Sequence, residues 1–206
     1  MFAEVKDMLG GEEPEEQALK TAVKKGLYGP IYSEKVAFLL DVSGSMSAGT
    51  EEGTRLEIAV RELARVLGSQ MTDDTYFNII PFSEEATPFA KKLQRAKTKT
   101  LEKTINKLPK LKPGGETNAF GALEAAFADP NVDTIYLLSD GSPTVGEEFI
   151  PDLIRLRVDE WNRDRRVIIN CIGFFPGTAK NQDKAEARDF LRQLAQENEG
   201  FYKEIY

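Results

Sequence analysis

Histidine is absent from this chain of 206 residues, and cysteine occurs only once, as Cys171. Without histidine, the chain cannot use a Ser-His-Asp triad, an imidazole general base or a histidine metal ligand. A single cysteine cannot form an internal disulfide or a structural zinc site, and it favours a reducing, cytoplasmic location. Any metal site must therefore use oxygen ligands, which favour magnesium and also suit manganese or calcium.

Three further sequence patterns are also absent. No stretch approaches the ~18 consecutive apolar residues of a membrane-spanning helix, and the acidic start MFAEVKDMLGGEEPEEQ lacks the pattern of a signal peptide. No Gly-x4-Gly-Lys-[Ser/Thr] phosphate-binding loop occurs. The net charge of −7 argues against a nucleic-acid partner. We therefore expect no membrane segment, no P-loop chemistry and no nucleic-acid binding.

From Lys35 onward, short apolar runs alternate with amphipathic stretches, which predicts strands that alternate with helices. The predicted strands are 36–40, 75–82, a short edge strand at 87–92, 134–138, 167–172 and 201–205. A capping box formed by Thr54 and Glu57 predicts the start of the first helix. Four further helices are predicted at 98–108, 120–127, 150–161 and 187–194. This alternation is typical of an α/β fold, in which helices cover both faces of a mostly parallel sheet.

The region before this pattern reads as a separate element. Residues 13–26 predict an isolated amphipathic helix, with Pro14 near its start and Gly26 at its end. The next stretch, GLYGPIYSE, has the glycine and proline content of a linker. We therefore predict an N-terminal helix and linker at 1–33, which would be the end of an upstream region in a larger chain, and a domain at 34–206.

Two of the predicted strands end in an aspartate, Asp41 and Asp140. Ligands of parallel sheets bind at the carboxyl ends of the strands, and two carboxylates placed there repel each other unless a cation lies between them. Ser43 and Ser45 follow Asp41, while Thr117 follows a Gly-Gly loop, so hydroxyls from both segments can converge on one point. Such oxygens suit a hard cation such as magnesium. Taken one at a time, the same residues are also ordinary strand-end and turn residues.

Three motifs carry a family resemblance. The stretch Asp41-Val42-Ser43-Gly44-Ser45-Met46 resembles the Asp-x-Ser-x-Ser motif of the von Willebrand factor A family. Thr117-Asn118, followed by Gly121-Ala122-Leu123, is similar to the second motif of that family, and Ser139-Asp140-Gly141 is similar to the third. The order and spacing agree over about 33–206. The linker 29–33 also looks like the entry to domains of this family at the C-terminal end of longer bacterial proteins.

The resemblance implies a Rossmann-like, six-stranded, mostly parallel sheet with one short antiparallel edge strand. It also implies a metal-ion-dependent adhesion site that binds an Asp or Glu side chain of a protein partner. In that site Ser43, Ser45 and Thr117 would ligate the metal directly. Asp41 and Asp140 would hold its waters, or one of them would ligate directly. An intact site that stays empty in the working protein is the alternative.

A metal-dependent enzyme, or an ATPase-associated adaptor, acting through Asp41 is the competing functional hypothesis. A strand-ending aspartate with a metal also occurs in aspartyl-phosphate phosphatases, but those usually carry a second aspartate two residues later. In this chain Ser43 stands there. The lack of histidine and of a P-loop also argues against catalysis, so we expect a binding module and not an enzyme.

Three further segments have two interpretations each. The loop 47–53 looks slightly lengthened and would flank the metal. Phe174-Phe175-Pro176-Gly177 follows a predicted strand, so its aromatic rings either form a partner-binding surface or fold into the core. The segment 91–112 contains nine basic residues and one acidic residue. It is either a patch for an acidic partner or a solvated helix face.

Overall fold

The computed structural model describes residues 26–175 and 184–205. The helix predicted at 13–26 lies outside these residues, apart from Gly26. The described chain forms a six-stranded sheet in the order β5-β4-β1-β6-β7-β8, and a two-stranded hairpin, β2-β3. The sheet strands are β1 (Lys35–Asp41), β4 (Tyr76–Phe82), β5 (Gln94–Arg95), β6 (Thr134–Ser139), β7 (Ile168–Phe174) and β8 (Tyr202–Ile205).

Five of the six strands run parallel, and only β5 pairs antiparallel, with its neighbour β4. The order of the strands reverses beside β1, because the chain first continues to β4 on one side and later to β6 on the other. Such a reversal opens a crevice at the carboxyl ends of the two strands. Leu40 pairs with Leu138, so the ends of β1 and β6 lie level with each other. The predicted fold is confirmed.

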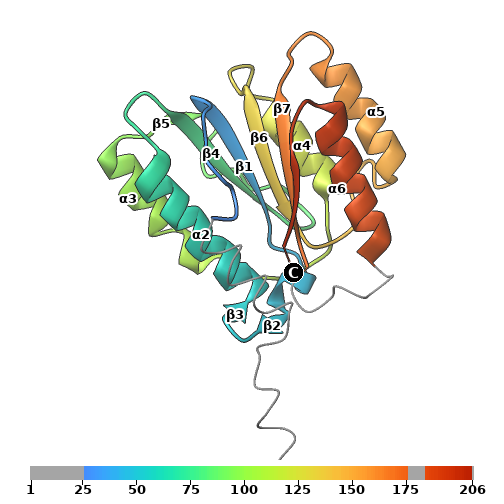
Figure 1. Cartoon of the computed structure of the whole chain (residues 1–206), viewed down its shortest axis with the longest axis horizontal. Coiled ribbons are helices and arrows are strands. Elements are labelled where there is room, and N and C mark those ends of the chain that lie inside the picture. Colours follow the sequence, from blue (N-terminus) through green and yellow to red (C-terminus); the bar gives the residue numbers. More distant parts are fainter. Residues whose placement is uncertain (1–25, 176–183, 206) are drawn as a thin grey trace, which may run out of the picture.

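Helices cover both faces of the sheet (Figure 1). One face packs against α2 (Arg55–Gln70) and α3 (Thr98–Ile105), and buries Phe38, Leu63 and their neighbours. The other face packs against α4 (Ala119–Phe127), α5 (Pro151–Asn162) and α6 (Ala185–Glu197). The short 3-10 turns η1 and η2 span Gly44–Ser47 and Leu108–Lys110. No helix in the described ranges is both long enough and apolar enough to cross a bilayer.

The segment that precedes β1 packs against the sheet. Leu27 and Tyr28 are completely or almost completely buried, and the Tyr28 ring meets the Phe38 ring edge-on at 5.5 Å between centroids. The Lys203 ammonium of β8 donates to the Gly26 carbonyl oxygen at 2.8 Å. The side-chain amide of Gln70, at the end of α2, donates to the Gly29 carbonyl oxygen at 3.0 Å. Residues 26–29 therefore belong to the same core as the strands.

The edge strand differs from the prediction, which placed it at 87–92, because the structure forms β5 at Gln94–Arg95. The backbone of 87–90 does run beside β4, and the Phe89 N–H donates to the Ile79 carbonyl oxygen at 2.8 Å. Further pairing is replaced by the Asn78 side chain, which binds both the N–H and the carbonyl oxygen of Ala90. Pro88 also has no N–H to donate. The Asn78 side chain therefore takes the place of strand pairing at Ala90, and β5 begins only at Gln94.

Helix α2 starts as predicted from the spacing of Thr54 and Glu57. The Glu57 N–H donates to Thr54 Oγ1 at 3.2 Å, and the Thr54 N–H donates to Glu57 Oε2 at 2.8 Å. This reciprocal pair is a complete capping box. It sets the start of α2 directly after the hairpin of β2 (Gly49–Thr50) and β3 (Gly53–Thr54), at the edge of the sheet where β1 ends (Figure 1).

Candidate metal site at the carboxyl edge of the sheet

Asp41 ends β1 and is fully buried. Its two carboxylate oxygens each accept one hydrogen bond. The Ser43 N–H donates to Oδ1 at 2.8 Å, and the Ser139 hydroxyl donates to Oδ2 at 2.5 Å. The end of β6 therefore holds the carboxylate that ends β1, which joins the two central strands at the point where the strand order reverses.

A short chain of polar contacts links the first and third motifs. The hydroxyl oxygens of Ser43 and Ser45 lie 3.1 Å apart. The Ser45 hydroxyl donates to Asp140 Oδ1 at 2.5 Å, across 95 positions of sequence. Because each hydroxyl donates its proton to one partner, its oxygen lone pairs stay available to a cation. The structure thus brings together Asp41, Ser43, Ser45 and Asp140.

The loop that precedes Thr117 brings this residue to the same region. The Gly44 N–H donates to the Gly115 carbonyl oxygen at 2.9 Å, which ties the loop before Thr117 to the turn after β1. A Cβ on Gly141 would lie 3.6 Å from Thr117 Oγ1, so the hydroxyl lies beside the residue that follows Asp140. Thr117 is 5% exposed and therefore nearly buried.

Burial, with a smaller contribution from the nearby Asp140 carboxylate, raises the pKa of the Asp41 carboxyl to about 6, against the lowering effect of the hydrogen bonds from Ser139 and Ser43. The charged form of Asp41 is therefore held at a cost in free energy. Such a cost is typical of functional sites, where a charge is kept for binding and not for stability.

The cation that the structure places at this site is Arg55, which the sequence analysis did not single out. Its guanidinium forms an ion pair with Asp140 Oδ2, and the two side chains are 6% and 0% exposed. Lys184 lies nearby, since its Nζ would be 4.0 Å from a Cβ on Gly141. One signal in the sequence pointed to Arg55. It follows the capping residue Thr54, and a cation in the first turn of a helix opposes the helix dipole.

The residues present fit a hard divalent cation. Hydroxyls and carboxylates are the ligand type of magnesium, manganese and calcium, and the raised pKa of Asp41 marks a carboxylate that a cation would relieve. Within 26–175 and 184–205, no three Asp, Glu, Cys or His side chains gather in a metal-binding arrangement. A site here therefore depends on its serine and threonine oxygens, and Ser43, Ser45 and Thr117 are the residues that would supply them.

The two aromatic residues at the end of β7, Phe174 and Phe175, do not form a partner-binding surface. Phe174 and Phe175 are both 0% exposed, and they pack into the cores on opposite faces of the sheet. Of the two interpretations of these rings, the core placement is confirmed, because consecutive residues of an extended chain point to opposite faces and both faces carry a buried core. Residues 176–178 lie outside the described part of the chain.

The other two segments lie at the surface. In the loop 47–53, Ser47, Gly49 and Glu51 are exposed, and the hairpin β2-β3 lies at the metal edge of the sheet (Figure 1). In the basic segment 91–112 the charged ends are also mostly exposed, and the Lys107 ammonium lies 4.9 Å from the centre of the Phe89 ring. The first of these surfaces adjoins the candidate metal site.

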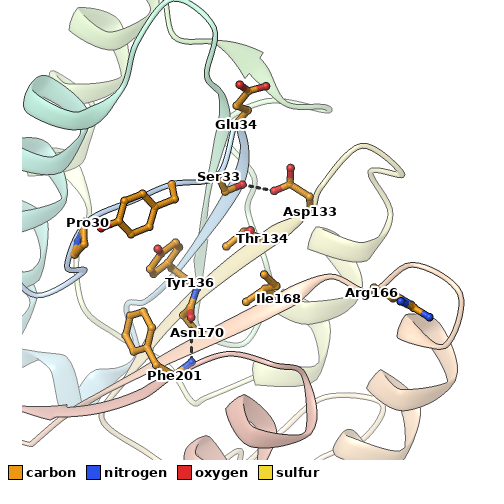
Figure 2. A pocket seen from close by; sticks show the side chains of 11 residues that line it. Pro30, Ser33, Glu34, Asp133, Thr134, Tyr136, Arg166, Ile168, Asn170 and Phe201 are labelled. Carbon is orange, nitrogen blue, oxygen red and sulfur yellow. Dashed lines mark hydrogen bonds between the residues drawn. The ribbon is translucent and has the colours of Figure 1, made fainter.

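A groove of about 760 Å³ lies at the opposite edge of the sheet, where the strands begin (Figure 2). Pro30, Tyr136, Ile168 and Phe201 line it, and Ser33 donates a hydrogen bond to Asp133 at its rim. It shares no lining residue with the candidate metal site. Its exposed surface is mainly apolar, and Ser33, Glu34, Asp133 and Thr134 add polar groups to its lining.

Comparison with known proteins agrees with this architecture. The family model described as "von Willebrand factor type A domain" matches residues 36–142. Inter alpha-trypsin inhibitor, heavy chain 4, of Mus musculus is 30% identical over 86% of this chain and 18% of that protein. The chain spans only 12% to 20% of the length of the curated relatives that it matches.

Solved structures show the same fold at low sequence identity. A von Willebrand factor type A protein from Catenulispora acidiphila superposes with a TM-score of 0.67 at 20% identity, over 84% of this chain and 39% of that one. The pilus adhesin SpaC from Lactobacillus rhamnosus GG superposes with a TM-score of 0.61 at 14% identity, over 84% of this chain and 28% of that one. Since the family model covers more than half of the sequence, the chain belongs to the von Willebrand factor type A domain family.

Proposed function

We propose that this domain is a metal-ion-dependent protein-binding module. Domains of this family typically act as adhesion or protein-binding modules, and the fold is shared with a pilus adhesin. In this chain Ser43, Ser45 and Thr117 would hold a divalent cation, most favourably magnesium. Asp41 and Asp140 would orient the hydroxyls and the waters around it.

The observation that carries this proposal is the contact between motifs that lie far apart in sequence. Ser45 donates to Asp140, and Ser139 donates to Asp41, so each motif positions the carboxylate of the other. Side chains that only cap a strand end would hydrogen-bond to neighbouring backbone groups and would not need hydrogen bonds between distant motifs. The crossed pattern instead presents several oxygens toward one place at the carboxyl edge of the sheet.

An acidic side chain of the partner suits the open side of this site. A bound divalent cation would supply an electrophilic centre for a carboxylate oxygen. The three hydroxyls are neutral donors, so they leave much of the positive charge available to an incoming Asp or Glu. The exposed residues of the loop 47–53 lie at the same edge and would add contacts around that anchor.

The test is partner binding with and without metal. A pull-down in magnesium and in excess chelator identifies partners that need the cation, and their affinity is then measured for the wild type and for Thr117→Ala. We expect chelation and Thr117→Ala each to weaken binding while the thermal unfolding curve stays cooperative. Affinity that is unchanged in both cases would move the binding surface away from this site, and the basic segment 91–112 would become the better candidate.

Enzymatic turnover through Asp41 is the alternative to a binding function. The described groups that donate to its carboxylate are a backbone N–H and the Ser139 hydroxyl, and neither is an acid or base near neutral pH. We therefore expect no metal-dependent hydrolysis of a generic phosphate ester such as p-nitrophenyl phosphate. Hydrolysis that disappears in Asp41→Ala would favour the enzyme, and would also reopen a role as an ATPase-associated adaptor.

A further inference from the structure

The ion pair between Arg55 and Asp140 lies inside the candidate metal site. We propose that Arg55 is a built-in counter-charge: it neutralises Asp140 in the metal-free protein, weakens metal binding, and makes tight binding depend on an acidic partner. This inference rests on the proposed function, since it describes how the same site is regulated.

Two features show that Arg55 is held here by a specific interaction. First, its side chain is 6% exposed, although arginine is rarely buried without a partner. Second, Arg55 is the first residue of α2 after its cap Thr54, where the helix dipole disfavours a cation. Both costs have to be offset, and the ion pair with the fully buried carboxylate of Asp140 contributes to offsetting them.

Arg55 affects a bound cation in two opposite ways. It fixes the Asp140 carboxylate, whose other oxygen accepts from Ser45, and this order favours a preformed site. It also places a positive charge on the far side of that one carboxylate group, which repels a cation at the hydroxyls. The ordering effect contributes about as much free energy as one hydrogen bond. The repulsion acts between the single charge of Arg55 and the double charge of the cation at short range, and is larger. The repulsion therefore dominates.

The charges of the cluster show why a partner becomes necessary. Asp41 and Asp140 contribute two negative charges and Arg55 one positive charge, so these three side chains together are at most singly negative without metal. A divalent cation then leaves it positive, and Lys184 beside Gly141 adds to that positive charge. A carboxylate from a partner brings the loaded cluster back toward neutrality. Without Arg55, the two aspartates alone would balance the cation.

The experiment is calorimetric titration of the full chain with magnesium, and with manganese as a second probe, for the wild type and Arg55→Gln. We expect Arg55→Gln to bind the metal at least about tenfold more tightly, because removing a nearby like charge is a large effect even at an effective dielectric of ~20. In chelator the variant should melt below the wild type, since Asp140 loses its partner, and metal should restore more of its stability.

Two variants serve as controls. Arg55→Lys keeps the charge, so its metal affinity should stay closer to the wild type than to Arg55→Gln. Arg61→Gln also removes one arginine and one ion pair from α2, but Arg61 is half exposed and pairs with Glu52 outside the cluster. Its metal affinity should change by less than about twofold, as expected for an exposed ion pair.

The outcomes separate the two levels of the proposal. If the wild type binds metal and Arg55→Gln binds it equally or more weakly, the role of Arg55 is wrong and the proposed function stands. If none of the proteins binds metal, the proposed function fails, and this inference fails with it. If Arg55→Gln does not fold in chelator, its affinity is measured from metal-induced folding by circular dichroism. Arg55→Gln/Asp140→Asn should then fold in chelator, and its failure to do so would contradict the ion-pair argument.

A second measurement tests the dependence on a partner. The probe is a short peptide with one glutamate, compared with the same peptide carrying glutamine. The glutamate peptide should raise the metal affinity of the wild type more than that of Arg55→Gln, because coupling between two ligands is reciprocal and the charge deficit exists only with Arg55. An equal rise in both proteins would overturn this part of the inference.

Discussion

The buried carboxylates at the two edges of the central sheet have pKa values that are shifted in opposite directions. At the carboxyl edge, burial raises the pKa of Asp41 to about 6, even though hydrogen bonds from Ser139 and Ser43 favour its charged form. Asp129 follows α4 near the amino edge and is only 7% exposed. Burial would raise its pKa too, but the Leu93 N–H at 2.7 Å and two donors of Asn131 outweigh burial and lower it.

The lowered pKa of Asp129 means that its charged form stabilises the fold, whereas the raised pKa of Asp41 means that its charged form costs free energy. Asp129 is surrounded by donors and needs no further partner. Asp41 shares its surroundings with a second carboxylate, Asp140, and remains costly as an anion without a cation. Destabilising arrangements of this kind are expected where function, and not folding, determines the residues.

The groove at the amino edge has a different character from the carboxyl edge. This groove of about 760 Å³ exposes mainly apolar surface (Figure 2), whereas the carboxyl edge brings together the oxygens of Ser43, Ser45 and Asp140. Ions need convergent oxygens and little space, so strand ends are the better guide for this fold.

The largest expected effect concerns Asp41 in the metal-free protein. Asp41→Asn should raise the free energy of unfolding at pH 7 by up to about 3 kcal/mol, because the raised pKa represents about two units of unfavourable burial. The folded state of the wild type binds the proton more tightly than the unfolded state, so its stability falls as pH rises from ~4 to about 6. The gap between the variants should therefore close near pH 4. Unfolding in chelator at both pH values measures it, and a gap of equal size at both would contradict the argument.

Metal should stabilise the wild type by nearly as much. At ~100 times its dissociation constant, magnesium should add ~2.7 kcal/mol to the free energy of unfolding. For a chain of this size, that is roughly 5–10 °C in melting temperature. Ser45→Ala should lose most of this gain, and its metal-free stability should fall by about 1–2 kcal/mol, because the Ser45 hydroxyl donates to the buried Asp140 carboxylate. The same metal-induced shift in both proteins would exclude Ser45 from the site.

A smaller effect with the opposite sign is expected at the amino edge. Asp129→Asn should lower the free energy of unfolding at pH 7 by about 1–2 kcal/mol, because it weakens charged hydrogen bonds to 93 and 131. The stabilisation from Asp129 is present above the unfolded pKa of ~3.9 and is lost as pH falls through its lowered folded value. Chelator should leave this difference unchanged. A metal-dependent difference would show that the two edges are coupled.

The smallest effect is expected in the groove at the amino edge. Tyr32 is 90% exposed, so Tyr32→Ser should change the free energy of unfolding by no more than about 0.5 kcal/mol. Its metal affinity by calorimetry should equal that of the wild type. A clear loss of metal binding would contradict the separation of the two edges.

Much of the fold followed from short-range patterns. The apolar runs predicted all five parallel strands, and the Thr54–Glu57 pair predicted the start of α2. Asp41 and Asp140 were expected at one edge because parallel strands end together, and the structure places them there with Ser43 and Ser45 in hydrogen-bonding contact. These predictions succeed because hydrophobic periodicity and capping depend on neighbouring residues in the sequence.

Tertiary structure decided the features that depend on distant residues. The edge strand moved to Gln94 because the Asn78 side chain occupies the backbone of Ala90. Phe174 and Phe175 became core residues because each packs into one of the two cores on opposite faces of the sheet. Arg55 joined the candidate site because the start of α2 lies beside the end of β6, which is 85 positions away from it in sequence. The sequence alone determined which oxygens gather at the carboxyl edge, whereas only the folded chain determined which cation faces them, since an ion pair depends on distance in space.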